Sequence, residues 1–471
     1  MSAHRLLCRS RIAILCGALG LVLAASAATT ASAAAPAAYV PGEVIVGYRA
    51  GLGGDVGAAI DAIGGMRPAQ AAPSARVRVL RLPAGERVTT ALARLRRQPG
   101  VAYAVPNYIA HAAGSFIPND AGIANVYQGW EKAQWNMLPG AGVDAPRAWF
   151  NLRADHRAGG SGVTVAVIDT GVAYRTWRHF MPSPDFSQTR FVSPYDFVDH
   201  DRYPLDRLGH GTFVAGVVAE STNNRIGLTG LAYGASIMPV RVLDAQGDGD
   251  QVTIARGIRY AVAHGAKVIN LSLEFLPSQV YSSSQIPQIV SALDYAHRRG
   301  VVVVAAAGND ETDQIAYPAR APGVISVGAT TRDRCLANYS NGGDTLSIVA
   351  PGGGSDAIVT GDEDCHPERR LPPIYQMTLT DPPNWSRFGF PGDYIGTSMA
   401  SPLVAATAAM VIASQVLGPH PTPDQVAARL EQTATPLGGS QPNDTYGWGL
   451  LNAGQATADL LQGGPVTSPT P

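Results

Sequence analysis

Short apolar runs alternate with segments of helical periodicity along most of the chain beyond residue 120. The apolar runs lack the alternation of a half-exposed strand, so both faces of each strand are expected to be buried, as in a parallel sheet covered by helices on both sides. We expect strands at 163–168, 236–243, 267–273, 301–306 and 324–328, and helices at 211–220, 252–264, 286–299, 399–414 and 423–433. The pattern predicts an α/β fold with three layers.

A different pattern precedes this region. Residues 43–48 and 76–82 alternate with the period of a strand, and residues 89–97 have helical periodicity. The composition then changes to Gly, Ser, Pro and Asn between residues 114 and 120, as is typical of a linker. We therefore expect a small α+β domain at 38–112 and a large domain at 115–462.

The N-terminus has the layout of a secretory signal peptide. Three arginines precede an apolar run at 12–25, and small residues follow at 25–27 and 31–33. The run is short for a membrane-spanning signal anchor, which is the alternative. We expect a signal peptide at 1–33 and a secreted or periplasmic protein.

Composition and charge exclude several classes of protein. With 46% hydrophobic and 15% charged residues, the chain is too apolar to be disordered. The net charge of −1 hides an asymmetry. Residues 1–113 hold 12 basic and 4 acidic residues, whereas the remainder holds 23 basic and 32 acidic residues. The acidic body argues against nucleic-acid binding and is compatible with bound cations or a basic partner, for which the N-terminal part is a candidate.

Two of the four cysteines lie in the predicted signal peptide, which leaves Cys335 and Cys365. In an exported protein this pair indicates one disulfide, although two separate buried thiols are the alternative. Residues 351–393 are rich in Gly, Pro and Asp and indicate a long surface insertion. The disulfide would anchor this insertion to the domain. Residues 463–471 indicate a flexible tail.

Three segments place reactive side chains at strand or helix ends. Asp169 ends an apolar strand, His210 opens an apolar helix between two glycines, and Ser398 starts a helix of small residues. Each has a structural explanation when taken singly: a turn former, a cap or core histidine, and an N-cap. A helix N-terminus also favours developing negative charge, which suits a nucleophile. Ser401 competes with Ser398 by residue type, but it precedes a proline within the helix.

Asn309 follows the strand at 301–306. Its side-chain amide is able to donate to the oxyanion of a tetrahedral intermediate, together with the backbone N–H of Ser398. A turn residue is the alternative. The four segments together are far more specific than any one of them.

These four motifs resemble those of the subtilisin-like serine peptidases, and the similarity covers about residues 120–460. The resemblance implies a subtilisin-like three-layer sheet and a secreted serine endopeptidase that acts through an acyl-enzyme. Asp169 would orient His210, His210 would act as the base, Ser398 as the nucleophile, and Asn309 would stabilise the oxyanion. Residues 38–112 resemble the family's inhibitory propeptide, which implies a zymogen that processes itself and an intramolecular inhibitor.

The resemblance also implies where a protein or peptide substrate binds. An extended substrate would pair with backbone at Gly247 and Gly249 and at Ser272, Leu273 and Glu274. The pocket for the residue before the scissile bond would be floored by Ala306, Ala307 and Gly308. Three residues depart from the family pattern: Glu274 replaces a usual glycine, and Phe213 and Leu403 replace common histidines. A carboxylate at position 274 would either narrow the pocket or favour basic residues.

Structural calcium is the cofactor that the resemblance implies. Asn224 would offer its side chain, with the carbonyls of Thr222, Ile226 and Leu228, and Asp185 would be the carboxylate partner. A second cluster, formed by Asp199, Asp201 and Asp206, is either an ion site or a solvated turn. Neither H-E-x-x-H nor paired C-x-x-C occurs, so the sequence has no zinc signature.

Two other functions are the alternatives. An α/β-hydrolase esterase needs G-x-S-x-G and, after the serine, an acid followed by a histidine. This chain has Ala400 in place of the second glycine, and no acid lies between Ser398 and His420, the one histidine that follows it. A catalytically degenerate binding or chaperone module would lack a catalytic residue, and all are present. We expect a monomer that binds protein substrates, with no nucleic acid and no membrane once the signal is removed.

Overall fold

The computed structural model describes residues 39–49, 65–68, 76–83, 85–108, 116–154, 157–358 and 365–458. These residues fall into two compact units, divided between residues 110 and 111. The predicted signal peptide and C-terminal tail, and the beginning of the linker, lie outside the described residues.

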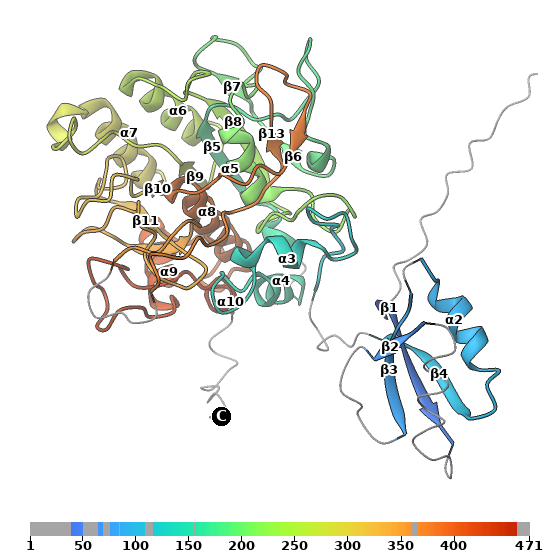
Figure 1. Cartoon of the computed structure of the whole chain (residues 1–471). Coiled ribbons are helices and arrows are strands. Elements are labelled where there is room, and N and C mark those ends of the chain that lie inside the picture. The colour runs from blue at the N-terminus through green and yellow to red at the C-terminus, as the bar shows by residue number, and fades with distance from the viewer. Residues whose placement is uncertain are drawn as a thin grey trace, which may run out of the picture. The chain divides into compact units, whose positions relative to one another are not determined.

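The described residues of the first unit include an antiparallel sheet and a helix (Figure 1). The strands are β1 (Tyr39–Tyr48), β2 (Arg67–Pro68), β3 (Val77–Arg81) and β4 (Val101–Tyr108), in the order β2-β3-β1-β4, and the helix is α2 (Val88–Leu95). Val44, Val46 and Leu80 of the sheet share a core with the apolar face of α2. The sequence did not indicate β4, which contains Pro106. Because β4 lies at the edge of the sheet, a residue without an N–H is tolerated there.

The second unit is built on a parallel sheet (Figure 1). Its strands run in the order β12-β11-β10-β9-β5-β8-β6, and β7 also pairs with β8. Every pairing among these strands is parallel. Their bounds are β5 Thr164–Asp169, β6 Arg190–Phe191, β7 Tyr195–Asp196, β8 Ser236–Arg241, β9 Val268–Leu271, β10 Val302–Ala306, β11 Val324–Thr330 and β12 Ile348–Pro351.

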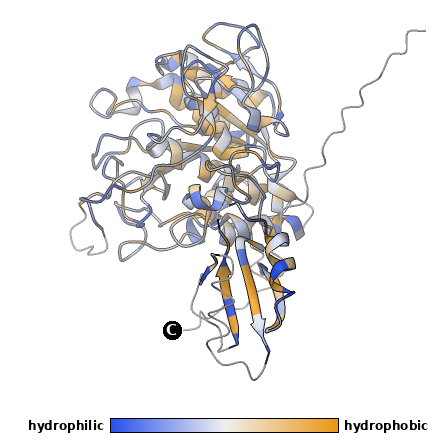
Figure 2. Ribbon diagram, turned by 45° about the vertical axis from the view of Figure 1, so that its right-hand side comes forward, coloured by the Kyte–Doolittle hydropathy of each residue, from blue (hydrophilic) through white to orange (hydrophobic). Residues whose placement is uncertain are grey.

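Helices cover both faces of this sheet. They are α3 Trp130–Ala133, α4 Ala145–Ala154, α5 His210–Ala219, α6 Gln251–Ala263, α7 Pro287–Arg298, α8 Thr397–Ser414, α9 Pro423–Gln432 and α10 Ala453–Ala456. Val165 and Val167 of β5 enter a core with α4, α5, α8 and α9, whereas Ala166 and Ile168 enter a second core with α6 and α7. Successive side chains of a strand therefore pack into opposite layers, and both layers are apolar. This explains the continuous apolar runs in the sequence (Figure 2).

Helix α8 passes through the larger core and is apolar on all sides. It is long and apolar enough to cross a membrane, but 83% of it is buried inside the protein. Burial on every side identifies it as the core helix of a folded domain.

The α/β class and the main elements agree with the sequence predictions, with helix ends displaced by one or two residues. The short strands β6 and β7, the strand β12 and the helices α3, α4 and α10 were not predicted. The prediction of a surface insertion at 351–393 is wrong for its middle, where Ile374, Gln376 and Thr378 are fully buried. Gln376 donates to the carbonyl of Thr229 and accepts from Gln134, so this stretch packs into the domain.

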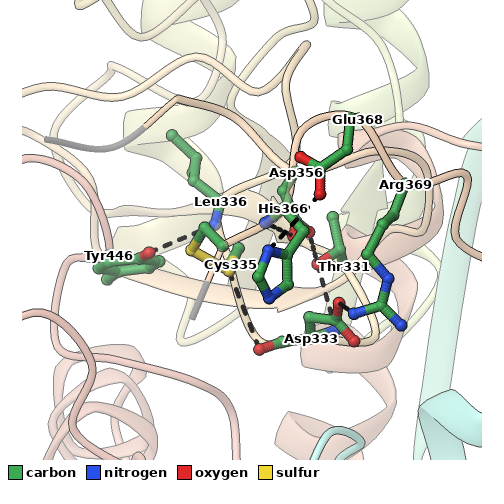
Figure 3. Close-up of a disulfide and its surroundings, with 10 residues drawn as sticks. Thr331, Asp333, Cys335, Leu336, Asp356, His366, Glu368, Arg369 and Tyr446 are labelled. Carbon is green, nitrogen blue, oxygen red and sulfur yellow. Dashed lines mark hydrogen bonds and ion pairs between the residues drawn. A yellow bond between two sulfur atoms is a disulfide. The ribbon is translucent and has the colours of Figure 1, made fainter. Parts of the chain in front are cut away.

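Cys335 and Cys365 form the disulfide that the sequence indicated, across a sequence separation of 30 residues (Figure 3). The bond ties the segment after β11 to the insertion. Asp356 accepts a hydrogen bond from the backbone N–H of His366 at 2.7 Å, and Arg369 pairs with Asp333 at 3.2 Å. The insertion is therefore anchored to the domain by polar contacts as well as by the covalent bond.

Candidate active site

The predicted reactive residues gather at the carboxyl edge of the parallel sheet. Asp169 is the last residue of β5, Ser272 follows β9, and Asn309 follows β10, while His210 and Ser398 lie at the N-termini of α5 and α8. The strand order reverses at β5, and ligands of open α/β sheets bind at such a point. A cavity of about 480 Å³ lies here, lined by His210, Asn309 and Ser398 among others.

Asp169 and His210 are joined by a short hydrogen bond. His210 Nδ1 lies 2.7 Å from Asp169 Oδ1, and the same oxygen accepts the backbone N–H of Thr170 at 2.7 Å. Burial alone would lower the pKa of His210, but the charge of Asp169, its hydrogen bond and the charge of Asp206 raise it above its usual value of 6.5. A carboxylate with this geometry fixes the ring so that Nε2 faces away from it.

Asp206 holds the start of helix α5 in place, a role that the sequence did not reveal. Its two oxygens accept the N–H groups of Leu208, Gly209 and Thr212 and the hydroxyls of Thr170 and Thr212. Gly209 has a φ of 106°, which suits glycine. Asp206 is 1% exposed, so the prediction of a solvated turn is wrong for this residue.

The rest of that acidic cluster forms ion pairs and turns. Buried Arg241 pairs with Asp196 at 2.9 Å and with Asp199 at 3.3 Å. Asp201 accepts the backbone N–H of Tyr203 at 2.7 Å. These contacts give the carboxylates structural partners within the chain.

Ser398 is fixed by a neighbour on the strand side of the cavity. Pro402 has no N–H to donate to the Ser398 carbonyl, which instead accepts the Ser272 hydroxyl at 2.8 Å. The Ser398 hydroxyl donates to the Ser272 carbonyl at 3.3 Å, and no hydrogen bond joins it to His210 among the described residues. Ser401 is buried and donates to Asn270 at 2.7 Å, which leaves Ser398 as the serine that faces the cavity.

The Asn309 side chain has one end fixed and one end in the cavity. Its oxygen accepts the backbone N–H of Thr397 at 2.9 Å and the Thr397 hydroxyl at 3.1 Å. Its amide nitrogen therefore faces the cavity, where it donates to Glu274 at 3.3 Å. An amide nitrogen held in this way is able to donate to an oxyanion in the cavity that Ser398 also lines.

Most of the predicted substrate-binding residues line the same cavity: Gly247, Gly249, Ser272, Leu273, Glu274 and Ala306. Ala307 and Gly308 are not among the lining residues. A Cβ on Gly308 would lie 2.6 Å from Glu274 Oε2, so the Glu274 carboxylate occupies the space over this glycine. The two replaced histidines are packing positions, since Phe213 stacks on Tyr394 with ring centroids 4.2 Å apart and Leu403 is fully buried.

The predicted calcium-binding loop gathers around Asp185. The Asn224 amide donates to Asp185 Oδ1 at 2.6 Å, and the Leu228 N–H donates to Asp185 Oδ2 at 3.0 Å. Within the described part of the chain, the carbonyls of Thr222, Ile226 and Leu228 accept no hydrogen bond. Carbonyl and carboxylate oxygens are the kinds of ligand that calcium uses, whereas the Asn224 side-chain oxygen accepts the Ile226 N–H at 2.8 Å.

Two further carboxylates lie at this loop and were not predicted. Asp120 accepts the N–H groups of Asn223 and Asn224 at 2.9 Å, and Glu220 is fully buried within range of the charges of Asp185 and Asp120. Burial raises the pKa of Asp185 and of Glu220 and raises that of Asp120 to about 6. Among the described residues, however, no group of three or more His, Cys, Asp or Glu side chains is arranged to hold a metal. A cation here would depend largely on carbonyls.

Comparison with known proteins identifies the family. The Subtilase family model matches residues 160–449, more than half of the chain, and a Fervidolysin N-terminal prodomain model matches residues 25–107. The chain is 35% identical over 412 residues to a thermophilic serine proteinase of Bacillus sp. (strain AK1), covering 87% of this chain and 86% of the relative. It is 33% identical to subtilisin E of Bacillus subtilis (strain 168), covering 78% of each.

A solved structure agrees with these matches. A protease from Pseudoalteromonas arctica superposes with a TM-score of 0.56 at 29% identity and covers 73% of this chain and 99% of its own. The resemblance and the fold class expected from the motifs are confirmed. The chain belongs to the subtilase family and is a serine endopeptidase.

Proposed function

We propose that this peptidase is secreted as a zymogen, processes itself, and hydrolyses peptide bonds of proteins through Asp169, His210 and Ser398. The observation that carries the proposal is the 2.7 Å contact between His210 Nδ1 and Asp169, beside a cavity that Ser398 also lines. Acid, base and nucleophile thus belong to one site.

The first chemical step is attack by Ser398 on the scissile carbonyl. Because His210 Nδ1 donates to Asp169, Nε2 is the unprotonated nitrogen that takes the Ser398 proton as Oγ bonds to the carbonyl carbon. The carbonyl electrons move to oxygen, which accepts from the Asn309 amide and the Ser398 N–H. The oxyanion collapses, the C–N bond breaks, and His210 returns the proton to the leaving amine.

Water completes the cycle. His210 Nε2 takes a proton from water, whose oxygen attacks the acyl carbon, and a second oxyanion forms at the same donors. Its collapse releases the carboxyl product, and the proton returns to Ser398 Oγ. The Asp169 carboxylate stabilises the imidazolium in both halves and stays ionised throughout.

The Ser398 hydroxyl must leave the Ser272 carbonyl before it reacts. A rotation about its Cα–Cβ bond turns Oγ from that acceptor toward His210, and catalytic hydrogen bonds commonly tighten only when substrate binds. The serine backbone stays fixed meanwhile, because the Ser272 hydroxyl holds its carbonyl.

An extended substrate would bind between the segments at 247–249 and 272–274 by backbone pairing. Pairing of this kind tolerates many sequences, so exposed or unfolded protein segments are the expected substrates. Gly249 lets its own segment pass close to Val242 of the same protein, because a Cβ on Gly249 would lie 2.6 Å from the Val242 carbonyl oxygen.

The first unit is proposed as an inhibitory propeptide, with residues 1–33 as the export signal. The prodomain match at 25–107 and the excess of basic residues before residue 114 against an acidic body support it. Replacing Ser398 with alanine should make the full-length precursor accumulate, while an exposed-serine control, Ser283→Ala, should mature normally. Normal maturation of Ser398→Ala in a protease-free expression system would show that another enzyme performs the cleavage.

Calcium is proposed to bind at Asp185, the Asn224 side chain and the carbonyls of Thr222, Ile226 and Leu228. When bound, the ion would neutralise the buried carboxylates and cross-link the loop to Asp185. It would stabilise the fold, at a distance from the reaction itself.

Hydrolysis of denatured casein, with and without a sulfonyl fluoride, tests the proposal as a whole. We expect inhibitor-sensitive hydrolysis that is lost in Ser398→Ala. A processed protein that binds denatured substrate without cutting it would support the alternative of a degenerate binding or chaperone module.

A further inference from the structure

Glu274 lies in the lining of the active-site cavity, at the end of the segment at 272–274. Its Oε1 accepts the Asn309 side-chain amide, and its Oε2 accepts the Asn309 backbone N–H, each at 3.3 Å. Oε2 also lies 2.6 Å from where a Cβ on Gly308 would be. The carboxylate therefore spans the space between the segment at 272–274 and the loop after β10.

This carboxylate has no cationic partner in the part of the chain that the structure describes. Among the described residues no Lys, Arg or His forms an ion pair with Glu274, and the cavity lining contains neither Lys nor Arg. The titratable groups nearby are Asp310, beside Glu274, and His210 and Asp248 in the cavity lining. Burial and the charge of Asp310 raise the pKa of Glu274. A half-buried carboxylate beside a second acid lacks the positive charge that would stabilise its ionised form.

The position of Glu274 relative to the reacting groups indicates what could supply that charge. Ser398 attacks a carbonyl whose oxygen binds the Asn309 amide, so the residue that owns this carbonyl sits directly over Asn309. Glu274 contacts the same amide at 3.3 Å and is within reach of that residue's side chain.

On the basis of the proposed function, we infer that Glu274 is a specificity-determining residue that favours substrates with Arg or Lys immediately before the scissile bond. The substrate cation pairs with the Glu274 carboxylate, for which the cavity lining holds no Lys or Arg. The sequence left two effects of Glu274 open, a narrower pocket or a preference for basic residues. A preference for basic residues uses the charge of the side chain as well as its size.

The same geometry couples recognition to catalysis. The Asn309 side-chain amide carries two N–H groups, one of which donates to Glu274, so a negative charge stands beside the nitrogen that is to receive the oxyanion. A substrate cation pairs with that charge and removes its repulsion of the oxyanion. An uncharged side chain leaves the repulsion in place, so the preference for a basic residue should appear in kcat as well as in KM.

The test compares peptide anilides that differ only in the residue before the cleaved bond. Arginine and citrulline form the decisive pair, because they are similar in shape and differ in charge, and leucine and phenylalanine represent apolar residues. With the mature enzyme, we expect kcat/KM to be about 10- to 100-fold higher for arginine than for citrulline. In Glu274→Gln, we expect that ratio to fall to within about twofold of unity.

A matched control is Glu311→Gln, which removes an exposed carboxylate two residues beyond Asn309 and should leave the ratio within about twofold of the wild-type value. Hydrolysis of the citrulline peptide by Glu274→Gln shows that the variant is folded and active. A wild-type ratio near unity, a preference for leucine or phenylalanine, or an arginine preference that survives in Glu274→Gln would overturn the inference. In each of these cases inhibitor-sensitive cleavage continues and the proposed function stands, whereas loss of all such cleavage would refute the function itself.

Discussion

Replacing Asp169 with asparagine isolates the electrostatic part of the proposed mechanism. Asp169 is fully buried, and its Oδ1 accepts from both His210 Nδ1 and the Thr170 N–H. An asparagine should keep its oxygen at this position, because an NH₂ group would face the Thr170 backbone N–H, which is always a donor. The amide nitrogen then takes the place of Oδ2, which has no hydrogen-bond partner among the described residues. The histidine keeps its tautomer and orientation and loses only the neighbouring charge.

The size of that loss follows from Coulomb's law. A carboxylate and an imidazolium with charge centres about 4 Å apart attract each other by about 4 kcal/mol at an effective dielectric constant of about 20. This corresponds to about 10³-fold in rate. Asp169→Ala also removes the orienting hydrogen bond and should cost about 10⁴-fold or more.

The assay is kcat for a chromogenic peptide. Because a slow variant matures slowly, its propeptide is removed at an inserted site by an unrelated, sequence-specific protease. Asp294→Asn, an exposed position on α7, is the control and should retain wild-type kcat. Equal losses in Asp169→Asn and Asp169→Ala, or an asparagine variant within about tenfold of wild type, would refute the reasoning.

The pH profile gives a second readout of the same change. The base must be neutral, and the charges of Asp169 and Asp206 raise the pKa of His210 above 6.5 against the opposing effect of burial. Activity should therefore rise with pH through a value above 6.5. In Asp169→Asn, the charge that raises the pKa of His210 is removed, while burial still lowers that pKa. The acidic limb of the profile should therefore move to lower pH.

Three further changes test other parts of the structure. Asn309→Ala should lower kcat by about 10²–10³ with little change in KM, the range found when this donor is removed in a subtilisin; an unchanged kcat would exclude an oxyanion role. The Cys335→Ser/Cys365→Ser double variant, with its 30-residue separation, should lower the free energy of unfolding by about 3.6 kcal/mol in guanidinium titrations of the Ser398→Ala protein; no loss would show that the polar contacts of the insertion suffice. Added calcium at about 100 times its Kd should stabilise the Ser398→Ala protein by about 2.7 kcal/mol in thermal unfolding, and Asp185→Asn should abolish the gain; an equal gain in that variant would place the ion elsewhere.

Local patterns were sufficient to predict the sheet and the reactive residues. Strand β5 is buried on both faces and delivers Asp169 at its end, and the glycines around His210 mark a crowded turn. A Cβ on Gly211 would lie 2.2 Å from the Gly171 carbonyl, which is the crowding that those glycines relieve. Because these constraints act within a few residues, they leave a signature in the sequence.

The features that sequence patterns missed depend on contacts between distant segments. Asp120 binds the loop at Asn224 from 104 residues away, and Gln376 donates to Thr229 across 147 residues. The Ser272 hydroxyl supports the Ser398 carbonyl across 126 residues. A polar residue in a loop has the same appearance in the sequence whether it faces solvent or a buried partner, so only the folded chain distinguishes them.

Locating the adduct of a sulfonyl fluoride by peptide mass spectrometry tests the central claim most directly. The reagent reacts with a serine activated by a neighbouring base. We predict a single adduct on the peptide that contains Ser398, formed in parallel with loss of activity and abolished in His210→Ala. An adduct on another residue, or full activity after complete modification of Ser398, would contradict the account.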